Sequence, residues 1–124
     1  MIKYILLYAG GALTAIWGIA HLFPTKSVVK GFGKLSAGNK NIITMEWIVE
    51  GVFLIFLGVL VAAVTFLDAG GMISTVVYML TVIALMVMAM VSLFTGFKVD
   101  FIVFKLCPVI FTISAVLIFL GRFL

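Results

Sequence analysis

Four long apolar runs, separated by short polar segments, dominate the chain. They cover about residues 4–23, 42–67, 72–95 and 101–120, and the third run contains no charged residue. Each has about 20 residues or more, which at about 1.5 Å per residue is enough to cross a hydrocarbon core of about 30 Å. Backbone groups in lipid must be satisfied within the protein, and these runs are too long for barrel strands. We therefore predict four transmembrane helices.

The predicted fold is an all-α integral membrane protein, one domain (1–124) built as a four-transmembrane-helix bundle with short loops. Hydrophobic residues make up 66% of the 124 residues and charged residues 10%, against about 45–50% and about 25% in soluble domains. A soluble domain of this size has too little interior for so many apolar side chains. The first run is longer than the hydrophobic region of a signal peptide, of about 7–15 residues, so we expect it to be a retained helix.

Positive charge indicates the orientation. The segment 24–41 carries Lys26, Lys30, Lys34 and Lys40, and the turn between the third and fourth helices carries Lys98 and Lys105. Only Lys3 and Arg122 lie toward the other end. Cytoplasmic loops are enriched in Lys and Arg, so we expect both lysine-bearing connections in the cytoplasm and both termini on the non-cytoplasmic side of an inner (plasma) membrane. Charge concentrated in one short loop argues against nucleic acid as a partner.

The segment 24–41 has a weak pattern of its own. Val28, Phe32 and Leu35 follow a helical spacing, with lysines on another face. An amphipathic segment of this kind lies on anionic lipid, which makes lipid headgroups candidate ligands of four lysines: Lys26, Lys30, Lys34 and Lys40. Gly31 and Gly33 disfavour a helix here, so the simpler interpretation is a solvated basic loop in the cytoplasm.

Small residues predict which helices touch. Gly11, Ala15 and Gly18 share a face of the first helix, and Gly51, Gly58 and Ala62 share a face of the second. Such faces let membrane helices approach closely, so we expect these two helices to pack together. A less apolar stripe on each helix should point inward; the stripes are Gly10, Thr14, Trp17 and His21 on the first, Thr81, Met88, Ser92 and Thr95 on the third, and Lys105, Pro108, Thr112 and Ala115 on the fourth. Pro108 is expected to kink the fourth helix.

Glu46 and Glu50 are the main chemical signal. They lie four residues apart on one face of the second helix and are two of only four acidic residues. Counted from the cytoplasmic ends at about 1.5 Å per residue, His21 lies about 3 Å inside, Glu46 and Lys105 about 7 Å, and Glu50 about 13 Å. We expect these four residues to form one polar cluster, lined by Trp17 and Trp47, with Lys105 as the counter-ion of a glutamate, because unpaired charges are costly in lipid.

The cluster has two interpretations. It is either functional, as a ligand pocket, a proton relay or a small active site open to the cytoplasm, or a structural network that fixes the register of the helices. A metal site is disfavoured because the glutamate pair has no second histidine, and a single histidine excludes bis-histidine haem but leaves a His–Met pair open. The methionines of the third helix (Met72, Met79, Met86 and Met90) are better explained by packing than by copper. Cys107 is expected to be inert packing. We predict no catalytic residue and no metal.

The motifs IWGIAHLFP and NIITMEWIVEG carry a family resemblance. Through His21, Pro24, Glu50 and Gly51 the chain resembles DoxX-like and related small four-helix proteins of the bacterial inner membrane. That resemblance implies an association with thiosulfate:quinone oxidoreduction and with membrane redox partners. A weaker resemblance is to the EXPERA group of sterol isomerases, whose polar spacing this chain does not reproduce.

Three functions follow as hypotheses. The leading one is a non-catalytic accessory or scaffolding subunit of a larger membrane complex, such as a redox complex, with membrane lipids and other subunits or further copies of the chain as partners. The second is a DoxX-like protein that binds a quinone or another lipophilic molecule at His21 and Glu50. The third is a proton-coupled carrier, for which four helices are few.

Overall fold

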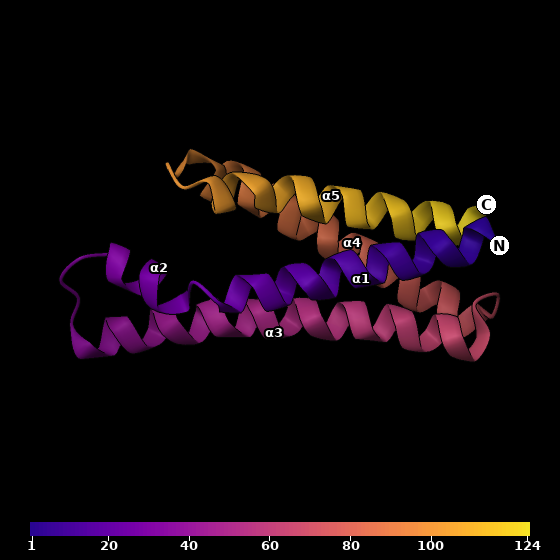
Figure 1. Ribbon diagram of the computed structural model, residues 1–124, viewed down its shortest axis with the longest axis horizontal. Helices are drawn as coiled ribbons and strands as arrows, with labels where there is room; N and C mark the ends of the chain where they lie inside the picture. The colour runs from indigo at the N-terminus through magenta and orange to yellow at the C-terminus, as the bar shows by residue number, and fades with distance from the viewer.

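The computed structural model describes residues 1–124 and is entirely helical. Its elements are α1 (Ile2–Leu22), α2 (Thr25–Gly31), α3 (Ala37–Asp68), α4 (Met72–Phe94), the 3₁₀ turn η1 (Gly96–Lys98) and α5 (Ile102–Phe123). Four of these helices, α1, α3, α4 and α5, are long and apolar enough to cross a membrane (Figure 1). The chain is therefore a multi-pass membrane protein, as its hydrophobic pattern predicts.

Helix α3 is longer than predicted, because it begins at Ala37 rather than near residue 42. The Ser36 side chain caps it by accepting a hydrogen bond from the Asn39 backbone N–H at 3.1 Å. Its 32 residues span about 48 Å, whereas the 21 residues of α1 span about 31 Å. The first turns of α3 consequently extend past the rest of the bundle at one end (Figure 1).

The basic segment is not a plain loop. It contains the short helix α2, which lies against α3 and buries Val28 and Val29. The favoured interpretation, which expected no helix here, is therefore wrong on that point, although the lysines are exposed as it expected. Of the apolar face in the amphipathic alternative only Val28 is buried, since Phe32 lies beyond α2 and is exposed. The two glycines that argued against a helix lie at its end: Gly31 is the last residue of α2, and Gly33 has a φ of 78°, which a glycine adopts readily.

Helix α4 changes neighbours along its length. Helix α1 packs between α3 and α5, and α4 packs mainly on α5 (Figure 1). Next to the Asp68 turn α4 also meets α3, where the Thr65 and Tyr78 hydroxyls are hydrogen-bonded at 2.9 Å and Ser74 donates to the Val64 carbonyl. Toward the opposite end α4 diverges from α3 and runs behind α5 (Figure 1). This divergence creates the site described below.

The expected contact between the first and second long helices is confirmed. A Cβ atom on Gly18 would lie 2.7 Å from the Gly51 carbonyl oxygen, and one on Gly58 would collide with the Gly11 carbonyl oxygen. The α1 and α3 backbones thus touch directly at two levels. Gly10 faces the other way, and its Cβ would lie 2.7 Å from Ile118 of α5. Neighbouring glycines on α1 therefore serve two different interfaces.

The predicted interior stripe of the last helix is partly wrong. Pro108 and Ala115 are buried, but Thr112 is exposed and Lys105 is partly exposed. The buried face of α5 consists of Cys107, Pro108, Phe111, Ser114, Ala115, Ile118 and Gly121. Polarity is a poor guide in this helix, because an exposed threonine bonds its own backbone: the Thr112 hydroxyl donates to the Pro108 carbonyl at 2.7 Å. Helix α5 runs unbroken through Pro108.

On α4, Thr81 is buried and Thr95 is exposed at the end of the helix. The methionines that raised the copper alternative face outward for the most part: Met72, Met86 and Met90 are exposed. In a multi-pass protein these exposed side chains contact lipid, and long flexible thioethers suit that environment. They do not converge on a site.

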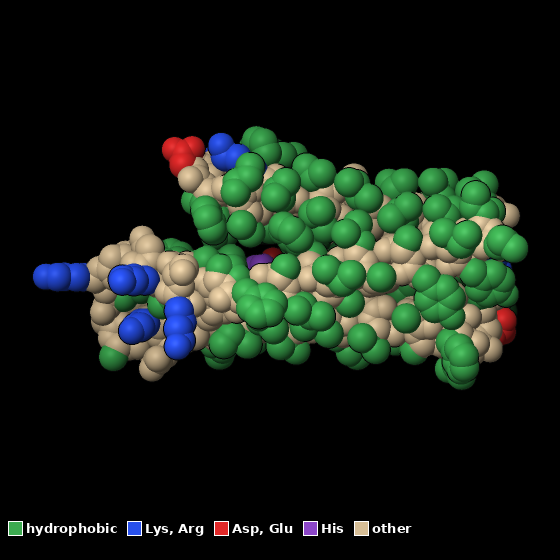
Figure 2. All heavy atoms as spheres, viewed as in Figure 1, with side chains coloured by type: hydrophobic (Ala, Val, Ile, Leu, Met, Phe, Trp, Pro, Cys, Tyr) green, Lys and Arg blue, Asp and Glu red, His purple; other side chains and the backbone are tan.

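Both termini lie at one end of the molecule, and the lysine-bearing α2 lies at the other (Figures 1 and 2). The six-lysine end is predicted to be cytoplasmic. Single cysteines introduced as Ser27→Cys and Leu124→Cys, each in a Cys107→Ser background, test this prediction. In intact cells a membrane-impermeant maleimide should label Leu124→Cys and spare Ser27→Cys, and lysed cells should label both. The reverse pattern would show the opposite orientation.

Candidate functional site

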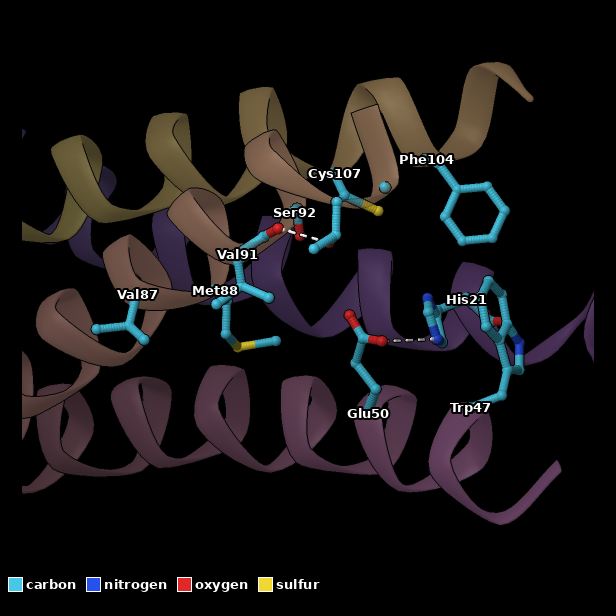
Figure 3. Close-up of a pocket in the computed structure, with 11 residues that line it drawn as sticks. His21, Trp47, Glu50, Val87, Met88, Val91, Ser92, Phe104 and Cys107 are labelled. Carbon is cyan, nitrogen blue, oxygen red and sulfur yellow. Dashed lines mark hydrogen bonds and ion pairs between the residues drawn. The ribbon is translucent and has the colours of Figure 1, made fainter. Parts of the chain in front are cut away.

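A cleft opens where α4 has diverged from α3. It has a volume of about 320 Å³. Its floor carries the imidazole of His21 and the carboxylate of Glu50 (Figure 3), and the purple histidine is visible in a hollow of the surface (Figure 2). Its lining comes from four helices and the turn after α4: His21, Trp47, Glu50, Val87, Met88, Val91, Ser92, Thr95, Gly96, Phe104 and Cys107. The cleft is the one place where the chain brings an acid and its only histidine together.

His21 is buried but incompletely satisfied. Its side chain is 2% exposed, and its Nε2 lies 3.6 Å from Glu50 Oε2 (Figure 3). That distance suits an ion pair but exceeds a normal hydrogen bond. Neither ring nitrogen has a hydrogen-bond partner, and leaving a buried polar group unpaired costs about 1–3 kcal/mol. The imidazole therefore has unused hydrogen-bonding capacity beside an open cleft.

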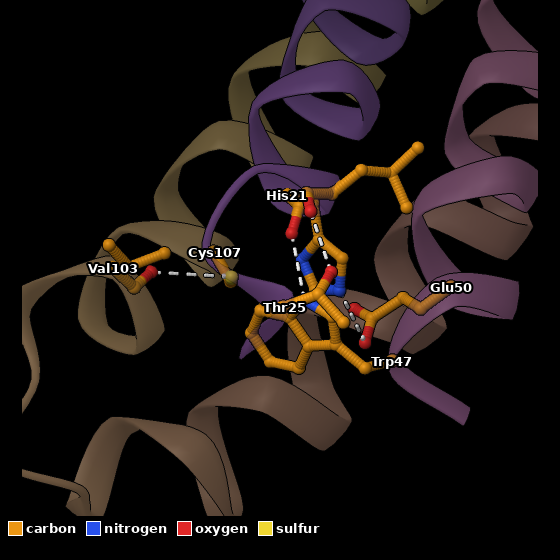
Figure 4. A network of polar contacts seen from close by, with 7 residues as sticks. His21, Thr25, Trp47, Glu50, Val103 and Cys107 are labelled. Carbon is orange, nitrogen blue, oxygen red and sulfur yellow. Dashed lines mark hydrogen bonds and ion pairs between the residues drawn. The ribbon is translucent and has the colours of Figure 1, made fainter. Parts of the chain in front are cut away.

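Trp47 holds the histidine in place. Its ring stacks on the imidazole with centroids 3.9 Å apart and planes 17° apart. Its Nε1–H donates to the His21 backbone carbonyl at 2.8 Å (Figure 4). That carbonyl is in the last turn of α1 and has no partner within its helix, so Trp47 also caps α1. The Thr25 hydroxyl donates to the next backbone carbonyl, that of Leu22, at 2.6 Å. Trp47 of α3 thus orients the histidine, and Thr25 of α2 secures the neighbouring residue of α1.

The walls of the cleft are mostly apolar. Val87, Met88 and Val91 of α4 face the floor across the opening (Figure 3). Phe104 of α5 lies edge-on to the Trp47 ring, with centroids 5.5 Å apart. Apolar walls with a few polar groups at fixed positions are typical of sites for small ligands. Cys107, expected to be packing only, also lines the cleft, and its thiol donates to the Val103 carbonyl at 3.3 Å.

The predicted four-residue cluster is only half formed. His21 and Glu50 meet, with Trp47 beside them, but Glu46 is exposed and lines a neighbouring groove, which also reaches Glu50 and Trp47, instead of the cleft. Lys105 is not the counter-ion of a glutamate, because its ammonium lies 3.7 Å from Asp100 near the start of α5. Trp17 is partly buried against the core and does not line the cleft; its Nε1–H has no hydrogen-bond partner. The correction reduces the site to one acid–histidine pair.

The predicted depths are also wrong. His21 and Glu50 were expected about 10 Å apart in depth at about 1.5 Å per residue, yet their side chains are 3.6 Å apart. The error comes from α3, whose first turns extend beyond the bundle, so that counting from residue 42 places Glu50 too deep. The pair lies level with the last turn of α1, toward the lysine-bearing end of the molecule. The Glu50 side chain is 36% exposed.

No three His, Cys, Asp or Glu side chains come together as a metal-binding set. Comparisons of this chain with protein-family models, with curated proteins and with solved structures found no match. The resemblance to DoxX-like proteins therefore rests on the sequence pattern alone, and the chain is assigned to no family. Its function has to be argued from the cleft.

Proposed function

We propose that this protein binds a small lipophilic molecule with a carbonyl or hydroxyl head, such as a quinone, in the cleft at His21 and Glu50. One observation carries the proposal. A buried imidazole has no hydrogen-bond partner on either nitrogen, and it lies 3.6 Å from a carboxylate at the floor of an apolar-walled cleft. Intramembrane ionisable residues are costly, so a pair of them beside a cleft is a functional hypothesis by default.

The chemistry of the pair suits such a head. An imidazole N–H can donate to a carbonyl oxygen, and a carboxylate accepts from a hydroxyl. A quinone presents carbonyls and its reduced form presents hydroxyls, so the pair offers a partner to both. A cavity of about 150 Å³ holds a benzene ring, and the cleft measures about 320 Å³. A substituted ring fits, and its tail can leave between α3 and α4 into lipid.

The accessory-subunit hypothesis makes a different prediction for the same residues. In that case the His21–Glu50 pair serves only to fix the register of α1 against α3, and ligand is absent. The protein would then purify with a stoichiometric membrane partner and without a bound small molecule. A proton-coupled carrier would need this pair to exchange protons with both sides of the membrane, and no observation favours that alternative.

A titration with decylubiquinone tests the proposal. Trp47, one of only two tryptophans in the chain, lines the cleft, so a quinone bound there should quench its fluorescence. In mild detergent we expect saturable quenching with one quinone per chain, and a quinone or similar lipid in organic extracts of the purified protein. Quenching that rises without saturation, as for free tryptophan octyl ester in the same micelles, would contradict the proposal.

A further inference from the structure

A second hollow, with a volume of about 790 Å³, lies between α2 and the first turns of α3. Four lysines line it, Lys26, Lys30, Lys34 and Lys40, together with the polar side chains of Asn41 and Thr44 among others, and no acidic residue does. We call it the lysine hollow. Figure 2 shows the blue lysine side chains gathered over this end of the molecule.

The fold explains why the lysines converge. Lys26 and Lys30 lie four residues apart on α2, so they share one face of that helix. Val28 and Val29 are buried and hold α2 against α3. The chain then turns back at Gly33, and α3 supplies Lys40 from its first turn. Three separate pieces of chain thus bring positive charges to one hollow.

These charges have no counter-ion within the protein. The structure has only two ion pairs, His21–Glu50 and Lys105–Asp100, and neither involves the lysine hollow. Like charges held close together repel one another, and an anion relieves that repulsion. The hollow therefore favours a ligand with several negative charges, and phosphate oxygens are the strongest acceptors that such lysines meet in a membrane.

The position of the hollow indicates the source of the phosphate. Helix α3 spans about 48 Å, about 18 Å more than a hydrocarbon core of about 30 Å. This excess is at the α2 end, which places the hollow at the level of lipid headgroups. The stripe of α3 that carries Asn41 and Thr44 continues at helical spacing into exposed apolar side chains, since Met45, Ile48 and Val52 are 53%, 41% and 53% exposed. Phosphate-binding charge above an apolar strip matches a lipid better than a free anion.

We propose that the lysine hollow binds the headgroup of an anionic lipid that carries two phosphates, with its acyl chains along α3. Four lysines match two phosphates better than one, and basic hollows beside transmembrane helices are suited to such headgroups. The inference does not depend on the ligand proposed for the His21–Glu50 cleft, because none of the four lysines lines that cleft. Free pyrophosphate shares the chemistry and must be distinguished by experiment.

The test uses the full chain in mild detergent with phosphatidylcholine, and native mass spectrometry counts the retained lipid. Cardiolipin should be retained at one molecule per chain, and phosphatidylcholine should be lost. The double variant Lys26→Gln/Lys30→Gln should bind cardiolipin about 25-fold more weakly, since each lysine near an anionic headgroup contributes about a fivefold factor. The matched control is Lys98→Gln/Lys105→Gln, which removes the same charge at the same end of the protein and should bind cardiolipin as the wild type does.

Several outcomes would overturn the proposal. Equal losses in the two double variants would show general electrostatic attraction rather than a site. Displacement of cardiolipin by an equal concentration of inorganic pyrophosphate would show a site for free anions instead of lipid. Lys26 and Lys30 are exposed, so their replacement should leave the helical circular dichroism unchanged. If the variant nevertheless misfolds, the wild type provides the test. Its retention of cardiolipin should fall as the sodium chloride concentration is raised, and retention that does not change with salt would contradict a site made of lysines.

Discussion

Replacing Glu50 with glutamine should weaken the binding of decylubiquinone by about 10- to 100-fold, because a hydrogen bond to a charged group contributes about 1.5–3 kcal/mol. Glutamine keeps the size of the side chain and removes its charge. The matched control is Glu46→Gln, which makes the same change one helical turn away at an exposed residue that does not line the cleft. That variant should bind the quinone as the wild type does. Saturable tryptophan quenching measures both affinities.

A variant that blocks the cleft can distinguish a ligand site from a His21–Glu50 pair that is only structural. Ser92 of α4 lines the cleft away from the His21–Glu50 pair (Figure 3), so Ser92→Phe should fill the opening and leave the pair intact. We expect it to abolish saturable quenching without changing stability. If Glu50→Gln unfolds the protein while Ser92→Phe leaves quinone binding unchanged, the pair serves the fold alone and the proposed function is wrong.

The Gly58→Leu variant should lose the packing of α1 on α3. A side chain at this position would meet the Gly11 carbonyl oxygen and would place its Cβ 2.6 Å from that of Ala15. The obstacle is backbone, which cannot rotate away as a flexible side chain can. We expect a loss of about 3 kcal/mol or more in the free energy of unfolding, at the upper end for overpacked cores. Titration with sodium dodecyl sulfate, followed by tryptophan fluorescence, measures it.

The control for this prediction is Gly38→Ala. Gly38 lies in the first turn of α3, and a Cβ there would meet nothing within 4 Å. Alanine favours a helix over glycine by up to about 1 kcal/mol, so this variant should be as stable as the wild type or slightly more stable. If Gly58→Leu and Gly38→Ala unfold at the same detergent concentration, the close approach of α1 and α3 does not stabilise the protein.

The two ends of the bundle have different roles. Near the Asp68 turn, α3 and α4 are held together by the Thr65–Tyr78 hydrogen bond, and Tyr78 is fully buried. At the lysine-bearing end the same two helices are apart, and the cleft occupies the space between them. The tight end holds α3 and α4 together, and the open end leaves room for the proposed ligand. Both proposed sites lie at the open end.

Much of the architecture could be predicted from the sequence. Long apolar runs can only be helices in lipid, so the four spans and most of their boundaries follow from length and composition. The contact between α1 and α3 follows from small residues at helical spacing, because only these allow backbones to touch, as Gly18 and Gly51 do. Of the predicted cluster, His21, Glu50 and Trp47 do meet, as expected if ionisable groups in a membrane helix pair with one another to reduce their cost.

The rest depended on the tertiary structure. In lipid both the inner and the outer face of a helix are apolar, so the hydrophobic pattern could not show that α4 packs mainly on α5 and diverges from α3. The cleft exists because of that divergence. A polar residue near the interface can point inward or outward at little cost, which is why Glu46 and Lys105 were misplaced. Helix α2 was only the less favoured alternative, because Gly31 and Gly33 lower the local helix propensity. Its burial of Val28 and Val29 against α3 is a tertiary contact that local propensity does not include.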